Sequence, residues 1–244
     1  MRRVAIIQAR MTSTRLPGKV LADLAGRPML SQQLSRLRKC ERLDEIVIAT
    51  SLGTADDALE SLARAEGLRC VRGDEHDVLS RYVLAARESA ADLVVRITAD
   101  CPLIDAVVTD RVVAAASDPA RPCDYASNTL VRSYPRGLDV EVFYRDVLER
   151  MARHATSTPA REHVTYFLHR EHPELFVTRD VVAASDASDL RWTVDTEDDL
   201  ELVREIYRRG NLPDVDLPYE ALVAMVRSDK ELSSLNAHVA QKSV

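Results

Sequence analysis

The stretch RVAIIQARMTSTRLPGK, residues 3–19, joins a short apolar run to a loop rich in cations. The apolar run has no polar face, which is typical of a strand buried on both sides of a parallel sheet. The loop that follows carries Arg10, Arg15 and Lys19. In open α/β sheets, ligands bind beyond the carboxyl ends of the strands. The stretch therefore predicts the first strand of an α/β sheet followed by an anion-binding loop.

The pattern continues as strands alternating with amphipathic helices. This alternation predicts parallel strands joined by right-handed crossovers, a three-layer Rossmann-like sheet in the first hundred residues. Strands are expected at 3–8, 45–50, 68–73 and 92–98, and helices at 28–40, 54–67, 77–90 and 105–117.

After residue 120 the pattern favours mixed or antiparallel strands. We expect one domain over 1–244, with a mixed sheet and a small inserted lobe at about 120–185. The last dozen residues are expected to be a polar tail. Within this second half we expect strands at 123–128, 137–144, 175–182 and 190–194, and helices at roughly 145–154, 159–171 and 197–210.

Charge is distributed unevenly along the chain. The whole protein carries a formal charge of −6, whereas residues 1–42 hold ten Lys or Arg against two acids. A basic segment in an acidic protein indicates a small anionic ligand, not a nucleic acid polymer. No apolar run is long enough to cross a membrane, and the N-terminus lacks the pattern of a signal peptide. A cytoplasmic protein without membrane partners is expected.

The first loop has the residues of a phosphate site. Its three cations can clamp phosphate oxygens, while Ser13 and Thr14 offer hydroxyl groups and backbone N–H groups that can curl around an anion. A triphosphate fits this need, and the alternative is a solvated loop. Neither the dinucleotide-binding glycine pattern nor the P-loop pattern occurs.

Two aspartates stand at predicted strand ends. Asp100 follows the strand at 92–98, and Asp195 follows the one at 190–194. Carboxylates in neighbouring loops can share Mg²⁺, which takes oxygen ligands. The alternative role is that of turn or capping residues. The adjacent Cys101 is interpreted as a packing residue, because no base accompanies it.

A third group lies in the segment SNTLVRSYPRGLDVEVF, residues 127–143, and in the later motif REHVTYF. Arg136 precedes a strand in which Asp139 and Glu141 share one face, and His163 follows in the later motif. Such acids can recognise sugar hydroxyls. They can equally be solvated or paired with arginines, and His163 can be a packing residue.

These loops resemble those of the cytidylyltransferase family that includes the CMP-Kdo and CMP-acylneuraminate synthetases, above all its spore coat polysaccharide biosynthesis branch. The resemblance implies a nucleotidyltransferase (GT-A-like) fold, CTP as donor, Mg²⁺ and a homodimer formed through the inserted lobe. The motifs that carry it are IIQARMTSTRLPGKVL, RITADCPLID, YPRGLDVEVF, EHVTYFLHREHPELF, LRWTVDTEDDLELV and LNAHVAQK.

Residue roles carried over from the family follow its motifs. Thr12 departs from the pattern, which usually has Gly at this position. The resemblance assigns nucleotide binding to Gln8, Ala9, Arg10, Ser13, Arg15, Lys19 and Thr98, catalysis to Arg15, Lys19, Asp100 and Asp195, metal binding to Asp100 and Asp195, and acceptor binding to Arg136, Asp139, Glu141 and His163.

The expected reaction transfers CMP from CTP to a sugar acid of the ulosonic or nonulosonic type and releases pyrophosphate. Alternatives are transfer to a sugar phosphate or phosphonate, use of UTP or dTTP, a glycosyltransferase of similar fold with an Asp-x-Asp metal motif, and a noncatalytic nucleotide sensor.

Overall fold

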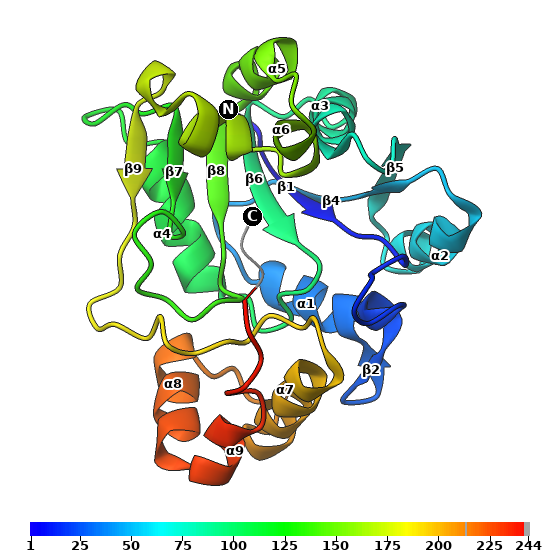
Figure 1. Ribbon diagram of the computed structural model, residues 1–244, viewed down its shortest axis with the longest axis vertical. Coiled ribbons are helices and arrows are strands. Elements are labelled where there is room, and N and C mark those ends of the chain that lie inside the picture. Colours follow the sequence, from blue (N-terminus) through cyan, green and yellow to red (C-terminus); the bar gives the residue numbers. More distant parts are fainter. Residues whose placement is uncertain (213, 242–244) are drawn as a thin grey trace.

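The computed structural model describes residues 1–212 and 214–241, which form a seven-stranded mixed sheet between layers of helices (Figure 1). A separate two-stranded ribbon pairs β2 with β3. The strands are β1 (Arg3–Gln8), β2 (Asp23–Leu24), β3 (Arg27–Pro28), β4 (Glu45–Ser51), β5 (Arg69–Gly73), β6 (Leu93–Thr98), β7 (Tyr125–Ser127), β8 (Glu141–Tyr144) and β9 (Thr178–Asp180).

The large sheet has the order β5-β4-β1-β6-β8-β7-β9. The first four strands in this order are mutually parallel, as the alternating pattern predicts. Strand β8 runs antiparallel to both of its neighbours, whereas β7 and β9 are parallel. This mixed sheet matches the predicted Rossmann-like nucleotidyltransferase fold.

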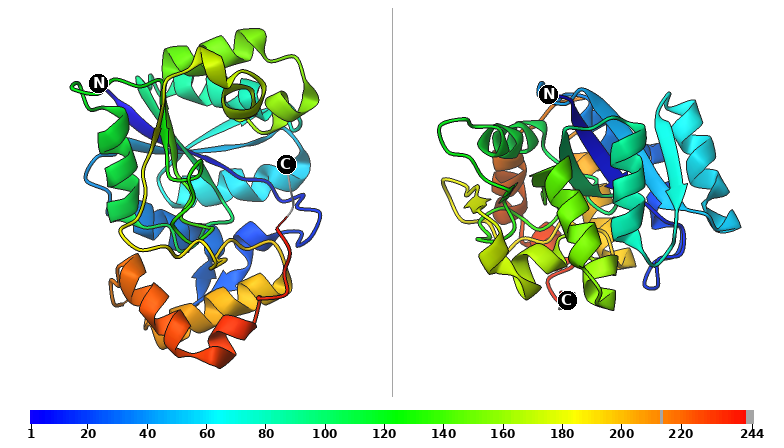
Figure 2. Two further views of the ribbon diagram at one scale, coloured as in Figure 1. Left: turned by 60° about the vertical axis from the view of Figure 1, so that its left-hand side comes forward. Right: turned by 90° about the horizontal axis from the view of Figure 1, so that it is seen from above.

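Helices cover both faces of this sheet, and a further group packs at one end (Figure 2). Successive residues of β1 point to opposite faces: Val4 and Ile6 enter one core, Ala5 and Ile7 the other. The α-helices are α1 (Met29–Leu37), α2 (Asp57–Ala65), α3 (Val78–Glu88), α4 (Ala106–Ala116), α5 (Arg145–His154), α6 (Thr158–Glu162), α7 (Glu197–Arg209), α8 (Tyr219–Ser228) and α9 (Lys230–Ser234).

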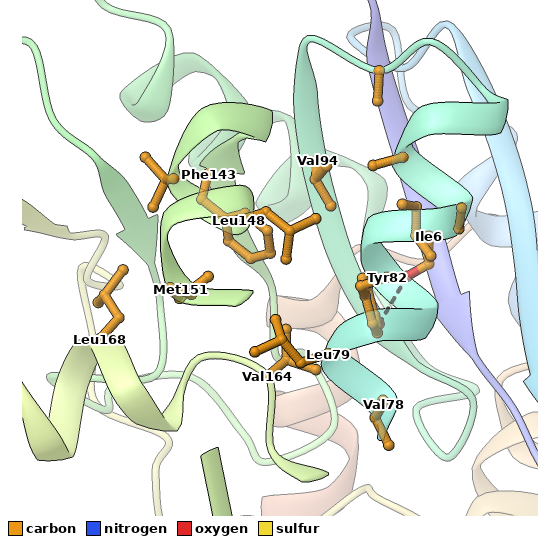
Figure 3. Packing of buried hydrophobic residues seen from close by; sticks show 14 of the residues in the cluster. Ile6, Val78, Leu79, Tyr82, Val94, Phe143, Leu148, Met151, Val164 and Leu168 are labelled. Atoms are coloured by element: carbon orange, nitrogen blue, oxygen red, sulfur yellow. Dashed lines mark hydrogen bonds between the residues drawn. The ribbon is translucent and has the colours of Figure 1, made fainter. Parts of the chain in front are cut away.

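One core lies between the sheet and helices α3, α5 and α6. Tyr82 of α3 is completely buried there, and its hydroxyl donates to the carbonyl of Ile6 in β1, 3.1 Å away (Figure 3). Leu148 and Met151 of α5 and Phe143 of β8 pack in the same core. The antiparallel part of the sheet is therefore joined to the parallel part through shared packing.

The opposite face of the sheet packs against α1, α2 and α4. A third core belongs to the C-terminal helices α7, α8 and α9, which enclose Trp192 and reach Leu24 and Leu103 of the main body. No helix in the described part of the chain is both long enough and apolar enough to span a membrane.

The predicted strand at 190–194 does not form. Only an isolated bridge joins Arg191 to Arg136, and the following backbone bonds to loops: Val194 N–H donates to the carbonyl of Asp100 at 2.8 Å. The predicted helix at 159–171 is also interrupted. It is divided into α6 and a π-helical turn at Phe167–Glu171, because Val164 has a positive φ of 52°.

Residues 120–185, expected to be an inserted lobe, supply β7, β8 and β9 to the main sheet and α5 and α6 to its first core. Short 3₁₀ turns complete the fold at Lys19–Leu21, Thr54–Asp56 and Pro173–Leu175. The role of this segment in acceptor binding and dimerisation stays a prediction.

Candidate active site

A cavity of about 500 Å³ opens at the carboxyl ends of β1 and β6. All seven residues assigned to nucleotide binding line it, together with the two candidate metal carboxylates and one of the four candidate acceptor residues. The lining residues are Gln8, Ala9, Arg10, Ser13, Thr14, Arg15, Lys19, Val20, Thr98, Ala99, Asp100, Glu162, His163, Asp195 and Gln241.

The loop after β1 is held in shape from both ends. Gly18 adopts φ 73°, a conformation that favours glycine, and its N–H donates to the carbonyl of Met11 at 2.9 Å. The N–H of Met11 donates in turn to the carboxylate of Asp56, which is completely buried and also accepts bonds from Thr50 and Ser51. Asp56 therefore anchors the loop to the end of β4.

The ammonium of Lys19 lies between the two predicted metal carboxylates. Its Nζ is 2.9 Å from Asp195 Oδ1 and 3.4 Å from Asp100 Oδ2, and it donates to the carbonyl of Val194 at 2.6 Å. Arg15 reaches the other oxygen of Asp195 at 2.7 Å. We call Arg15, Lys19, Asp100 and Asp195 the cavity cluster. The two carboxylates converge on one point, as a shared cation requires.

These contacts keep Lys19 and Asp195 ionised. Burial disfavours the charged form of Lys19, but the charges of Asp100 and Asp195 outweigh it and raise the pKa of the ammonium. Burial also works to raise the pKa of Asp195, yet Lys19, Arg191 and Arg15 together hold it below its usual range. At neutral pH both side chains are charged.

Backbone pairing places Asp195 beside Asp100, although 95 residues separate them. The bond from Val194 N–H to the Asp100 carbonyl fixes the distance between the two loops. A capping box then starts α7: Thr196 Oγ1 accepts from Asp199 N–H, and Asp199 accepts from Thr196 N–H at 3.1 Å. Asp195 thus stands directly before a rigid helix start.

A smaller cavity of about 160 Å³ shares Gln8, Arg10 and His163 with the first and adds Arg81 of α3. Arg81 is only 2% exposed and forms no ion pair within residues 1–212 and 214–241; its Nε has no partner there. Burial lowers the pKa of Arg81 and outweighs the opposing effect of Tyr82, Asp56 and Asp74. Its Nη1 donates to the carbonyl of Asp74 at 2.9 Å, and a buried guanidinium without an ion pair among the described residues is suited to a ligand carbonyl or anion in the cavity beside it.

Three of the four predicted acceptor residues, Arg136, Asp139 and Glu141, do not line the 500 Å³ cavity. Asp139 forms a bidentate salt bridge with Arg132, with N–O distances of 2.7 and 3.0 Å. Arg136 exchanges backbone bonds with the 190–192 segment. The turn at Gly137 touches that segment so closely that a Cβ would lie 2.7 Å from the N of Thr193. Their role toward an acceptor stays a prediction.

Glu141, the third of them, is buried in a second charge cluster. One carboxylate oxygen is bonded to Arg96, and the other accepts from Tyr125 at 3.1 Å and Thr165 at 2.5 Å. Burial disfavours the charged Arg96, but surrounding groups, foremost Glu141, raise the pKa of Arg96. We call Arg96, Tyr125, Glu141 and Thr165 the buried cluster. It meets the cavity through Arg96 Nη2, which donates to Gln8 Oε1 at 3.0 Å.

His163 is the predicted acceptor residue that does line the cavity. It caps α6, directly before the positive φ of Val164, and Glu162 lies beside it in the cavity wall. Burial and the nearby cations Arg96 and Arg10 lower the pKa of His163 in spite of Glu162. The free imidazole is therefore neutral at pH 7.

Sequence reasoning missed several residues of this site. Arg81 lies inside a regular amphipathic helix, and Asp56 lies in a helix start, so neither has a distinguishing local pattern. Gln241 lies in LNAHVAQK, a motif to which the sequence assigned no role.

The glycosyltransferase alternative would need an Asp-x-Asp metal motif in the site. The sequence contains one such triplet, Asp214–Asp216, but it falls between α7 and α8, and neither aspartate lines the cavity.

A family model described as cytidylyltransferase matches residues 4–212. The chain belongs to the cytidylyltransferase family. It is 35% identical over 218 residues to the spore coat polysaccharide biosynthesis protein SpsF of Bacillus subtilis, covering 86% of this chain and 88% of SpsF. The predicted family resemblance is confirmed.

Solved structures agree with this cytidylyltransferase membership. A cytidylyltransferase from Leptospira borgpetersenii superimposes with a TM-score of 0.89 at 28% identity, over the full length of both chains. A CMP:2-keto-3-deoxy-manno-octonic acid synthetase complexed with CTP gives a TM-score of 0.65 at 21% identity, over 86% of this chain and 100% of the other. The second likeness concerns the fold alone.

Proposed function

We propose that this cytidylyltransferase transfers CMP from CTP to a sugar acid of the ulosonic or nonulosonic type and releases pyrophosphate, in the biosynthesis of a surface polysaccharide or glycan. The observation that carries the proposal is the convergence of Arg10, Arg15 and Lys19 with Asp100 and Asp195 in one cavity at the carboxyl end of the sheet. Membership in a family with SpsF supports the polysaccharide context.

In this reaction an acceptor oxygen attacks the α-phosphorus, and the bond from that phosphorus to the bridging oxygen of the β-phosphate breaks. Negative charge gathers on the departing pyrophosphate. Lys19 and Arg15 would turn from their carboxylates to these oxygens, and Arg10, which has no ion pair in the described part of the chain, would add a third cation. Catalysis then rests on positioning and charge neutralisation.

The donor set fits Mg²⁺. Asp100 and Asp195 both direct oxygens to the position of the Lys19 ammonium. The described residues contain no group of three or more His, Cys, Asp or Glu able to hold a metal, so the other ligands would be phosphate oxygens and water, the usual habit of Mg²⁺. When bound, the ion would neutralise charge on the reacting phosphates.

The smaller cavity would accept the base. Arg81 offers a buried donor to a pyrimidine carbonyl, and Gln8 lies between the two cavities. Because Arg96 donates to Gln8 Oε1, the amide nitrogen of Gln8 is left to face a ligand. On the acceptor side, His163 stands in the cavity wall, and the carboxylate of a sugar acid is a suitable partner for it.

We propose a homodimer and a cytoplasmic location for this enzyme. Exposed apolar side chains gather at and around the edge strand β9, within the segment predicted to dimerise; they are Leu130, Val131, Leu175, Val177 and Val182. The strand β9 itself is polar, and exposed apolar side chains that flank a sheet edge are suited to an interface between subunits. Sedimentation equilibrium of the purified protein tests this, and a monomer at micromolar concentration would contradict it.

The deciding experiment measures pyrophosphate release with Mg²⁺ from CTP, UTP, dTTP and ATP, each against sugar acids, sugar phosphates and phosphonates. Release only with CTP and a sugar acid supports the proposal. Preference for UTP or dTTP would contradict the donor, and release with a sugar phosphate or phosphonate would contradict the acceptor. Binding of CTP without release from any pair would favour a nucleotide sensor.

A further inference from the structure

Residues 235–241, which follow α9 within the expected polar tail, pack beside the active site. Residues 242–244 of that tail lie outside the described residues. The segment 235–241 rises from the C-terminal helices toward the lower edge of the sheet (Figure 1). Asn236 is only 6% exposed, and its Nδ2 donates to the carbonyl of Arg191 at 2.9 Å and to Asp199 Oδ1 at 2.8 Å. This segment is thus hydrogen-bonded to Arg191 and Asp199, two residues that both contact Asp195.

Arg191 connects this segment to the cavity cluster. Its side chain is nearly buried, and each nitrogen has an acceptor: Nε donates to Asp199 Oδ1 at 3.0 Å, Nη2 to Asp195 Oδ2 at 2.7 Å, and Nη1 to Gln241 Oε1. A planar guanidinium held at all three nitrogens cannot rotate. The orientation of the Asp195 carboxylate is therefore set in part by Arg191, and that of Arg191 by Asn236 and Gln241.

We propose that Asn236 and Gln241 are positioning residues of the active site, which fix Arg191 and through it the reacting geometry of Asp195. This inference rests on the proposed function, because it gives Asp195 a catalytic role. Gln241 also stands in the wall of the large cavity, so the C-terminal segment both orients a carboxylate and closes one side of the site.

The space under this segment provides a reporter. A cavity of about 290 Å³ lies between the segment and helices α7 to α9, lined by Asn236, Val239 and the protein's single tryptophan, Trp192. Trp192 is completely buried, and its Nε1 has no partner in the described residues. Loosening the segment opens this cavity to solvent and to acrylamide, whatever the activity of the enzyme.

The test compares Asn236→Ala, Gln241→Leu and Gln241→Glu with His238→Ala. His238 lies on the same segment but is exposed and contacts only Asp198 among the described residues. We expect kcat to fall about tenfold in Asn236→Ala and Gln241→Leu. Gln241→Glu keeps an acceptor for Arg191, so its kcat stays within about threefold, while its added charge raises KM for CTP several-fold. His238→Ala keeps both constants.

Acrylamide quenching of Trp192 gives the second measurement. We expect the quenching constant to rise at least twofold in Asn236→Ala and to stay unchanged in His238→Ala. Unchanged quenching, or raised quenching with kcat at the wild-type value, would overturn the inference. A wild-type enzyme without pyrophosphate release from any pair would contradict the proposed function, and with it the catalytic role of Asp195; the quenching comparison would then show only whether Asn236 holds the segment over Trp192.

Discussion

The cavity cluster and the buried cluster are built from the same chemistry, an arginine or lysine facing carboxylates at the edge of the sheet. They differ in what surrounds them. In the cavity cluster Asp100 keeps 26% of its side chain exposed, and Arg15 27%, so a ligand can replace their partners. In the buried cluster Arg96 and Glu141 are each 11% exposed, and Tyr125 and Thr165 occupy the remaining carboxylate oxygen.

The comparison indicates that a charged residue is a candidate for catalysis when a ligand can replace its ion-pair partner. Both carboxylate oxygens of Glu141 accept hydrogen bonds inside the fold, so its charge compensates that of Arg96. Asp100 has one long contact to Lys19 and an open side. Predictions that separate stability from turnover therefore test the comparison directly.

The largest effect is expected for Asp100→Asn. Loss of one negative charge from the cavity cluster should lower kcat with CTP at least a thousandfold, roughly 4 kcal/mol. The Tm should fall by no more than about 4 °C, since a partly exposed pair contributes about 1 kcal/mol or less. Steady-state kinetics and thermal unfolding check both parts. A wild-type kcat in Asp100→Asn would show that Asp100 has no role in the reaction.

Glu141→Gln should show the opposite behaviour. Removing the charge leaves Arg96 buried without compensation, and the free energy of unfolding should fall by about 3 kcal/mol. Urea denaturation measures the loss, with Glu149→Gln as control, because Glu149 forms only an exposed pair with Arg87. Wild-type stability combined with a raised KM for the acceptor would place Glu141 in acceptor binding, as the family resemblance implies.

Lys19→Ala should raise KM for CTP tenfold to a hundredfold, because a charge-assisted contact contributes about 1.5–3 kcal/mol. Lys39→Ala is the matched control, since Lys39 pairs on the surface with Asp216. Initial rates over a range of CTP concentrations give the comparison. Equal dependence on CTP in both variants would show that Lys19 does not contact the phosphates.

The smallest expected effect is the uptake of part of a proton by His163 when a ligand binds. In the free protein, burial lowers the pKa of His163, so the imidazole is mostly neutral at pH 6.5. An anionic ligand in the cavity favours the charged form and raises this pKa, which predicts uptake of a fraction of a proton on binding. Calorimetry of CTP binding in buffers of different ionisation enthalpy measures it. Identical uptake by His163→Gln would exclude His163 as its source.

The parallel half of the fold could be predicted from sequence almost to the residue. The strand at 3–8 is built on a continuous apolar run, and outside this half the helix predicted at 197–210 forms at Glu197–Arg209 behind the N-cap Thr196, so local pattern suffices for both. The expected strand at 190–194 failed for a physical reason. Its apolar residues are real core residues, but their backbone partners are loops at Arg136 and Asp100, which no periodicity reveals.

The candidate site divides in the same way. Arg10, Arg15, Lys19 and Asp100, predicted from loops after β1 and β6, meet in one cavity because parallel strands deliver their carboxyl ends to the same side of the sheet. Asp195 joins them through the bond from Val194 N–H to the Asp100 carbonyl and not through a strand. Contacts between residues far apart in the sequence were not predicted. Asp56 accepts a hydrogen bond from Met11, 45 residues away, and Gln241 accepts one from Arg191, 50 residues away. Whether Asp139 or Glu141 is free for an acceptor depends on arginine partners, which only the fold identifies.

The ammonium of Lys19 between two carboxylates has a consequence for selectivity. An anion that approaches Lys19 or Arg15 does not meet an unpaired cation, because every contact it makes with either side chain costs a contact already present with Asp195. Inorganic phosphate brings negative charge but no cation to replace Lys19 or Arg15 beside Asp195, so it gains little from that exchange. In the proposed reaction, a triphosphate accompanied by a divalent cation would supply both signs at once, and the site would discriminate by requiring simultaneous replacement of cation and anion.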